Sequence, residues 1–143
     1  LKTSELVDKI KAKKYNIVQV FGDPAGYQVQ SSIGIGEAHL FYQLFGKQIF
    51  ALRDKASRSI NSGISHVRSF ICSEDGTRRL HIDKKCTGII EDLEGYRYPE
   101  HKENFALKPL PLKDGYHCHG NDALRYFLVN KFPIRNFKLR TTK

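Results

Sequence analysis

A short apolar run near the start of the chain, Ile17–Phe21, restricts the possible folds more than any other stretch of the sequence. Its residues are Ile, Val, Gln, Val and Phe, and Gly22, Asp23 and Pro24 follow it directly. Because Gly and Pro end strands, the run predicts a short strand over 17–21. A strand that is apolar at nearly every position is typical of a sheet covered on both faces. The run therefore predicts a sheet with helices packed against it.

Helical and strand patterns alternate along the remainder of the chain. The clearest helical pattern is Ile60, Ile64, Val67 and Ile71, whose spacings of four, three and four place them on one helix face. We expect helices at about 2–14, at 38–45 with Gly46 as C-cap, from Ser57 or Ser59 to 71, at 84–96, and within 117–131, amphipathic from Ala123 and ended by Pro133. We expect strands at 17–21, 48–52 and 80–83, and loops at 27–35 and 97–116. This alternation predicts an α/β domain with at least partly parallel strand pairing.

Composition points to a polyanionic partner. The 143 residues fit one domain, and 24 Lys and Arg against 15 Asp and Glu give a formal net charge of +9. Such an excess suggests nucleic acid, and a basic surface that serves only solubility is the alternative. Three cysteines without a C-x-x-C pair argue against a disulfide framework and suggest a reducing compartment. No apolar run approaches membrane-spanning length, so we expect no membrane partner and no signal peptide.

Two aspartates occupy positions that suit metal chemistry. Asp23 follows the best strand, and functional groups of α/β sheets gather just beyond the carboxyl ends of strands. Asp122 lies near the start of the last predicted helix. In metal-dependent phosphoryl transfer, carboxylates from separate elements converge on two divalent ions about 3.5–4 Å apart, and Mg²⁺ or Mn²⁺ takes such oxygen ligands. Each aspartate also has a structural interpretation, Asp23 as a turn residue before Pro24 and Asp122 as an acid stabilised by a helix N-terminus.

Four segments, in this order, resemble the C-terminal nuclease domain of phage terminase large subunits, the motors that cut and package viral DNA. VFGDPAG (20–26) resembles the family's second acidic motif, and ALRDKASRSINSGISHVRSFI (51–71) resembles the strand, lysine and helix that follow it. RLHIDKKCTGIIEDLEGYRYPE (79–100) resembles the section with a short strand, a helix and an ExY-type ending. HGNDALRYFL (119–128) resembles the closing HxxDALRY motif, whose Asp is the third acidic ligand.

The resemblance implies an RNase H-like fold, a mixed sheet flanked by helices, and two-metal endonuclease chemistry with Mg²⁺ or Mn²⁺ on concatemeric duplex DNA. Carried over by position, Asp23 and Asp122 are catalytic metal ligands, and His119 lies beside the site. Lys55 lies where the family has a lysine, so we expect it to contact DNA phosphate, and a solvated loop lysine is the alternative. The implied nuclease-like domain covers 1–132, followed by a basic tail at 133–143. The implied partners are duplex DNA, other terminase domains, the small terminase subunit and the portal, in the host cell cytoplasm.

The chain also departs from the family pattern. The family's first catalytic Asp lies on an opening hairpin, whereas no strand precedes Leu6 here. We therefore expect a fragment or truncated form of a longer terminase, with a fold that is incomplete at the N-terminus. Such a chain is expected to lack full activity alone. The ATPase motif GxxxxGK[ST] is absent as well. The alternative function is a non-catalytic module that binds DNA or docks on another packaging component. A zinc site at 117–119, a dinucleotide loop at 34–39 and base stacking by Tyr96 and Tyr98 are weaker alternatives.

Overall fold

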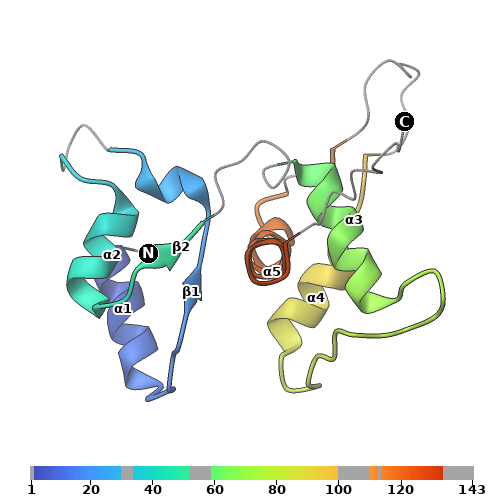
Figure 1. Ribbon diagram of the computed structural model, residues 1–143, viewed down its shortest axis with the longest axis horizontal. Helices are drawn as coiled ribbons and strands as arrows, with labels where there is room; N and C mark the ends of the chain where they lie inside the picture. The colour runs from blue at the N-terminus through green and yellow to red at the C-terminus, as the bar shows by residue number, and fades with distance from the viewer. Residues whose placement is uncertain (1, 30–33, 52–58, 100–109, 113, 134–143) are drawn as a thin grey trace, which may run out of the picture. The chain divides into compact units, whose positions relative to one another are not determined.

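The computed structural model describes residues 2–29, 34–51, 59–99, 110–112 and 114–133, and the chain divides into two compact units, Leu1–Arg53 (unit 1) and Asp54–Lys143 (unit 2) (Figure 1). The protein is mixed α/β, as the alternation of patterns predicts. Unit 1 contains α1 (Thr3–Ala12), β1 (Val20–Phe21), the 3₁₀ helix η1 (Pro24–Tyr27), α2 (Glu37–Phe45) and β2 (Ile49–Phe50). Unit 2 contains α3 (Ile60–Ile71), α4 (Thr87–Gly95) and α5 (Cys118–Lys131).

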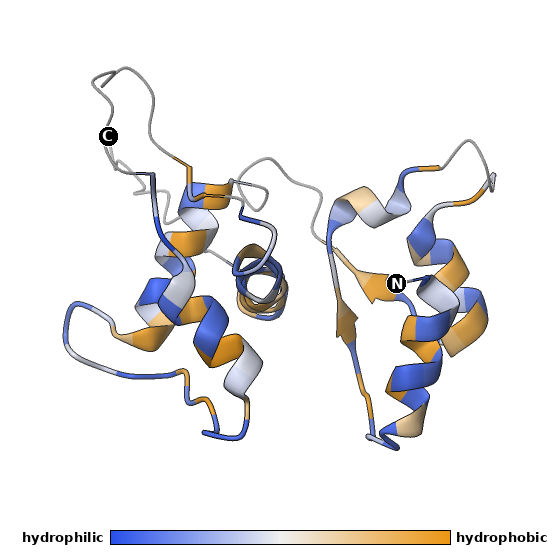
Figure 2. Cartoon of the chain, turned by 180° about the vertical axis from the view of Figure 1, so that it is seen from behind, coloured by the Kyte–Doolittle hydropathy of each residue, from blue (hydrophilic) through white to orange (hydrophobic). Residues whose placement is uncertain are grey.

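The two strands of unit 1 pair in parallel, with Val20 opposite Ile49 and Phe21 opposite Phe50, which confirms the predicted parallel pairing. The sheet is shorter and less buried than expected, because Val18 is 77% exposed and the β1 side chains are only half-buried. Two opposite views show α1 and α2 on the same side of the strands, so in the described part of unit 1 the second face carries no helix (Figures 1 and 2). The described helices of unit 1 therefore cover one face of the strands.

The helices α1 and α2 lie side by side and run in the same direction. Where both begin, the hydroxyl of Thr3 donates to the carboxylate of Glu37, and where both end, Nζ of Lys11 donates to the carbonyl of Leu44 at 2.8 Å. α2 ends at Gly46 as predicted, with a φ of 78° that glycine adopts without strain because it has no Cβ. The two helices contact each other and supply the buried apolar residues in the described part of unit 1, which are Val7, Ala38 and Phe41.

In unit 2, α5 contacts both α3 and α4. Leu128 of α5 packs with Val67 and Phe70 of α3, and Leu80 and Leu124 join this core. A helix that touches two others buries residues around much of its circumference. The polar side chains of α5 are therefore also drawn into the interior, which decides the surroundings of Asp122.

The first predicted helix of unit 2 and its cap are confirmed. Oγ of Ser59 accepts a hydrogen bond from the N–H of Ser62 at 3.3 Å, so Ser59 is the N-cap of α3. Ile64 is buried, as the periodicity predicts, but Ile71 is 41% exposed. Phe70, one position earlier, is the last residue of α3 that faces the core, because its ring packs against α5.

Residues 80–83 are not a strand. The N–H groups of Arg79 and Leu80 donate to the carbonyl of Phe70 at 2.9 and 2.8 Å, so the segment closes the end of α3. In the described residues of unit 2 there is no strand with which it could pair. The helix predicted at 84–96 is shorter, Thr87–Gly95, and the loops predicted at 27–35 and 97–116 agree where the structure describes them, apart from Tyr27, which ends η1.

Candidate functional site

Asp23 lies directly beyond the carboxyl end of β1, where the sequence places it. Its Oδ1 accepts a hydrogen bond from the N–H of Ala25 at 2.8 Å, and Pro24 is the first residue of η1. Asp23 is thus the N-cap of this 3₁₀ helix, which is the turn role that the sequence offers as an alternative. The residue is exposed. Position and exposure suit a ligand-binding group, and the cap fixes the direction of the carboxylate.

Asp122 does not lie at the mouth of its helix. α5 begins at Cys118, so Asp122 is in the second turn and the helix N-terminus does not account for it. Its Oδ1 instead accepts hydrogen bonds from Nη2 and Nε of Arg125, at 2.8 and 3.3 Å. Arg125 is 4% exposed, whereas the side chain of Asp122 is 35% exposed. The pair therefore presents a carboxylate at the surface on top of a buried guanidinium.

Asp122 compensates the burial of the Arg125 guanidinium. Burial acts to lower the pKa of Arg125, but the hydrogen bond and the negative charge of Asp122 outweigh it, so the pKa is raised above its usual value. The methylene groups of Arg125 lie against Gly63 of α3, where a Cβ would come within 2.6 Å of Cδ. This contact requires glycine at position 63.

The first turns of α5 are attached to α4 through Asp92. Oδ2 of Asp92 accepts from the N–H of Gly120 at 3.0 Å, and its backbone carbonyl accepts from Nδ2 of Asn121 at 2.6 Å. Nδ2 of Asn121 also donates to the carbonyl of His117 at 2.7 Å. The residues of HGNDALRY that resemble a catalytic motif thus also hold three helices together.

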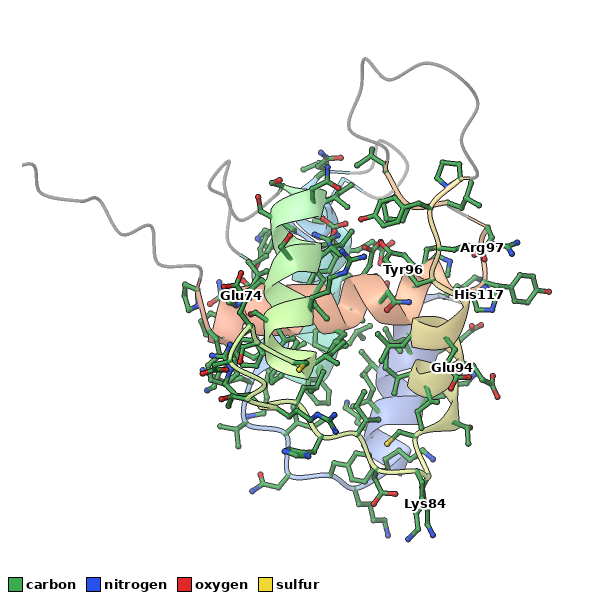
Figure 3. The ribbon with its side chains drawn as sticks, turned by 90° about the vertical axis from the view of Figure 1, so that its right-hand side faces the viewer. Glu74, Lys84, Glu94, Tyr96, Arg97 and His117 are labelled. Carbon is green, nitrogen blue, oxygen red and sulfur yellow. The ribbon has the colours of Figure 1, made fainter. Side chains whose placement is uncertain are left out.

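His117 contacts Asp114 just before α5, with Nδ1 of the imidazole and Oδ2 of the carboxylate 2.6 Å apart. The hydrogen bond from His117 and the N–H groups of Tyr116 and His117 lower the pKa of Asp114 to about 2. The imidazole of His117 packs on Gly95, and Figure 3 shows Tyr96 and His117 at the same end of α4. Burial and then the negative charge of Asp122 raise the pKa of Tyr96, so the phenol shares the surroundings of that carboxylate.

The structure places the two proposed ligands in different units, Asp23 in unit 1 and Asp122 in unit 2, so their meeting in one site stays a prediction. His119 is exposed on the first turn of α5, and Lys55 lies outside the described residues. Among the residues that are described, no three His, Cys, Asp or Glu side chains form a group suited to a metal ion. The guanidinium of Arg125 on Oδ1 also weakens the attraction of Asp122 for a cation.

Sequence reasoning missed the partners of Asp122. The spacing of Asp122 and Arg125, three residues apart on one helix, is a readable signal for an ion pair. The approach of Gly63 and of Asp92 leaves no such signal, because these residues meet α5 only through the packing of separate helices.

Two surface hollows lie away from these aspartates. One, of about 300 Å³, lies in unit 1 between η1 and α2 and is lined by Tyr27, His39 and Tyr42 among others. The other, of about 610 Å³, follows the second half of α3 and is rich in serine, with Arg68 and Asp75 among its lining residues. Neither lining contains Asp23 or Asp122.

Across the described ranges, every helix is too short or too polar to cross a lipid bilayer. Comparisons of the chain with protein-family models, with curated proteins and with solved structures found no match.

Proposed function

We propose that the chain is the metal-dependent endonuclease part of a DNA-packaging terminase large subunit and has an RNase H-like fold. The observation that carries the proposal is the position of Asp23, exposed directly beyond the carboxyl end of a parallel strand, where α/β proteins gather functional groups. The four motif resemblances supply the reaction class. The partners are duplex DNA, other terminase domains, the small subunit and the portal, in the host cell cytoplasm.

In this proposal Asp23 and Asp122 hold Mg²⁺ or Mn²⁺. Bound ions supply charge stabilisation to the attacking and leaving oxygens of the phosphodiester. The chain contributes fixed directions for its carboxylates: the N–H of Ala25 orients Asp23, and Arg125 orients Asp122. Because Arg125 occupies Oδ1 of Asp122, the other carboxylate oxygen is the one offered to a cation.

A second candidate is a non-catalytic module that binds DNA or docks on another packaging component. The observation that favours it is the same ion pair, because a carboxylate neutralised by a buried guanidinium has a complete structural role without metal. The net charge of +9 suits phosphate binding in either case.

Mn²⁺ binding by the purified chain tests the proposal. Asp23→Asn and Asp122→Asn should each lower Mn²⁺ affinity by about tenfold or more, on the scale found when groups around a metal are removed. If the two ligands share one site, the double variant should be little worse than either single variant. Glu91→Gln, the same charge change at an exposed position of α4, should leave affinity unchanged.

Asparagine keeps an oxygen that accepts from Arg125 or from the N–H of Ala25, so unchanged circular dichroism should accompany the loss of metal. Independent, additive losses would place the two aspartates in separate sites and overturn the shared site. If Glu91→Gln lowered Mn²⁺ affinity as much as the aspartate variants do, the loss would come from the change in net charge and not from a metal site. Nicking of plasmid DNA in Mn²⁺ but not in EDTA would identify the endonuclease, because the binding module binds DNA without hydrolysis.

A further inference from the structure

Most charges of unit 1 are divided between its two ends; Lys2 at the start of α1 and Asp8 in its middle are the exceptions among the described residues. α1 and α2 are parallel, so their last turns lie together, as the contact of Lys11 with the carbonyl of Leu44 shows. From Lys9 to Gly22 the sequence contains no Asp or Glu. We call the surface at this end, where the two helices finish, the lysine end; its basic residues are Lys9, Lys11, Lys13, Lys14 and Lys47.

Asp23, the carboxylate of unit 1 proposed to bind metal, lies at the opposite end, as does Glu37. Glu37 is in the first turn of α2, beside Thr3 at the start of α1. Asp23 caps η1, and η1 lies beside the start of α2, since a Cβ on Gly26 would be 3.8 Å from that of Ala38. The lysine end is therefore a surface separate from the Asp23 position.

Lys14 adopts a backbone conformation that costs free energy. Its φ is +54°, in the left-handed region that is unfavourable for residues with a Cβ. α2 ends with glycine in the same conformation, Gly46 at φ 78°. A lysine where glycine would be unstrained indicates that its side chain is used.

Helix-end electrostatics accounts for only part of this arrangement. Lysines in a last turn stabilise a helix by complementing its dipole, and Lys11 also binds the exposed carbonyl of Leu44. Neither effect requires Lys14, which follows the helix. Tyr15 is 71% exposed directly beside it, and Asn16 is exposed as well. Tyr and Asn side chains are common donors to nucleic acid phosphates, alongside lysine.

We propose that the lysine end binds the phosphate backbone of duplex DNA, as an anchoring surface apart from the carboxylates and independent of metal. Duplex DNA carries one negative charge per about 1.7 Å of its axis, so several lysines engage phosphates together. Lys9 on α1 and Lys13, the C-cap of that helix, are four residues apart, about 6 Å along its axis, and Lys14 and Tyr15 extend the surface beyond it. The inference rests on DNA as the partner in the proposed function, but not on cleavage.

Binding of a 30-base-pair duplex by the full chain, measured in EDTA, tests this surface. The loss of three phosphate contacts should make the negative slope of log affinity against log salt less steep by about 2.7. It should also reduce the affinity at 0.1 M salt by well over tenfold. The variant combines Lys9→Gln, Lys13→Gln and Lys14→Gln. The matched control combines Arg78→Gln, Lys84→Gln and Lys85→Gln, which removes the same charge from exposed residues between α3 and α4.

The proposal expects the control to lose less than threefold. Equal losses in both triple variants would show a bulk charge effect and overturn it, as would an unchanged affinity in the first. Vesicles with phosphatidylserine form a second arm, and preferential loss of vesicle binding would assign the surface to membranes instead. Because EDTA is present throughout, the measured DNA affinity does not depend on metal binding by Asp23 and Asp122. The metal proposal can therefore fail without affecting this test.

Lys14→Gly gives a second measurement with two readouts of opposite sign. Glycine relieves the left-handed strain, so thermal stability should rise or stay level, while DNA affinity falls severalfold. Unchanged affinity would show that Lys14 is not kept for binding and would contradict the inference.

Discussion

Replacing Gly120 with alanine tests how α5 is attached to α4. An alanine Cβ would lie 2.0 Å from Oδ2 of Asp92 and 3.2 Å from Cδ1 of Ile89, so Asp92 must turn away. The N–H of Gly120, in the first turn of α5, then loses its 3.0 Å bond to Asp92, and helix geometry offers it no replacement acceptor. A hydrogen bond to a charged group contributes about 1.5–3 kcal/mol, and alanine returns up to about 1 kcal/mol of helix propensity. We expect Gly120→Ala to lower the free energy of unfolding by about 1–2 kcal/mol.

Urea denaturation followed by helical circular dichroism measures this change, and Gly88→Ala is the matched control. Gly88 is in the first turn of α4 with open space where its Cβ would be, so the same substitution there should stabilise by up to about 1 kcal/mol. In an Asp92→Ala background, Gly120→Ala should be neutral or stabilise by up to about 1 kcal/mol, because both the clash and the hydrogen bond that it breaks are already gone. A stabilising Gly120→Ala, or full additivity with Asp92→Ala, would refute the reasoning.

Three further predictions concern the charged groups around α5. Arg125→Ala should lower the free energy of unfolding by about 2 kcal/mol, less than for a fully buried ion pair, because Asp122 stays partly in contact with solvent. Arg125→Met should lower it less, because methionine fills the volume beside Gly63 that alanine leaves empty. Equal losses in urea denaturation would rule out the packing contribution. The pKa of Asp114 is lowered to about 2 in the folded state, so its ionised carboxylate stabilises the fold above about pH 4. This contribution disappears as the pH falls through about 2. Asp114→Asn should therefore lower Tm at pH 7, with a gap that closes between pH 4 and pH 2; a gap independent of pH would contradict it. Asp122→Asn should move the Tyr96 phenol titration, followed by tyrosinate absorbance, to lower pH, because one cause of the raised pKa is removed; the same curve in both proteins would show that Asp122 does not act on Tyr96.

Helix existence and several helix ends were predictable because their signals are local. Ser59 caps α3 through an N–H three residues away, and Gly46 ends α2 by adopting a left-handed φ. Asp23 likewise caps a turn with an N–H two residues on. Such interactions depend on a few consecutive residues, so residue type and spacing are enough to find them.

The candidate site was only partly predictable. The position of Asp23 beyond a strand follows from the sequence order of apolar run, Gly and Pro. The surroundings of Asp122 do not, because α5 begins a turn earlier than the amphipathic pattern indicates. The buried place of Arg125 depends on Gly63, and the attachment of Gly120 depends on Asp92, both from other helices.

The sequence by itself determined the mixed α/β class, the order of the helices, the caps at Ser59 and Gly46, and the excess of positive charge. Tertiary structure alone decided that Phe70 rather than Ile71 faces the core, and that 80–83 closes a helix instead of extending a sheet. It also decided that Asp122 pairs with a buried arginine. The physical reason is that backbone conformation follows mainly from neighbours along the chain, whereas burial and pairing depend on which distant side chains fill the same space.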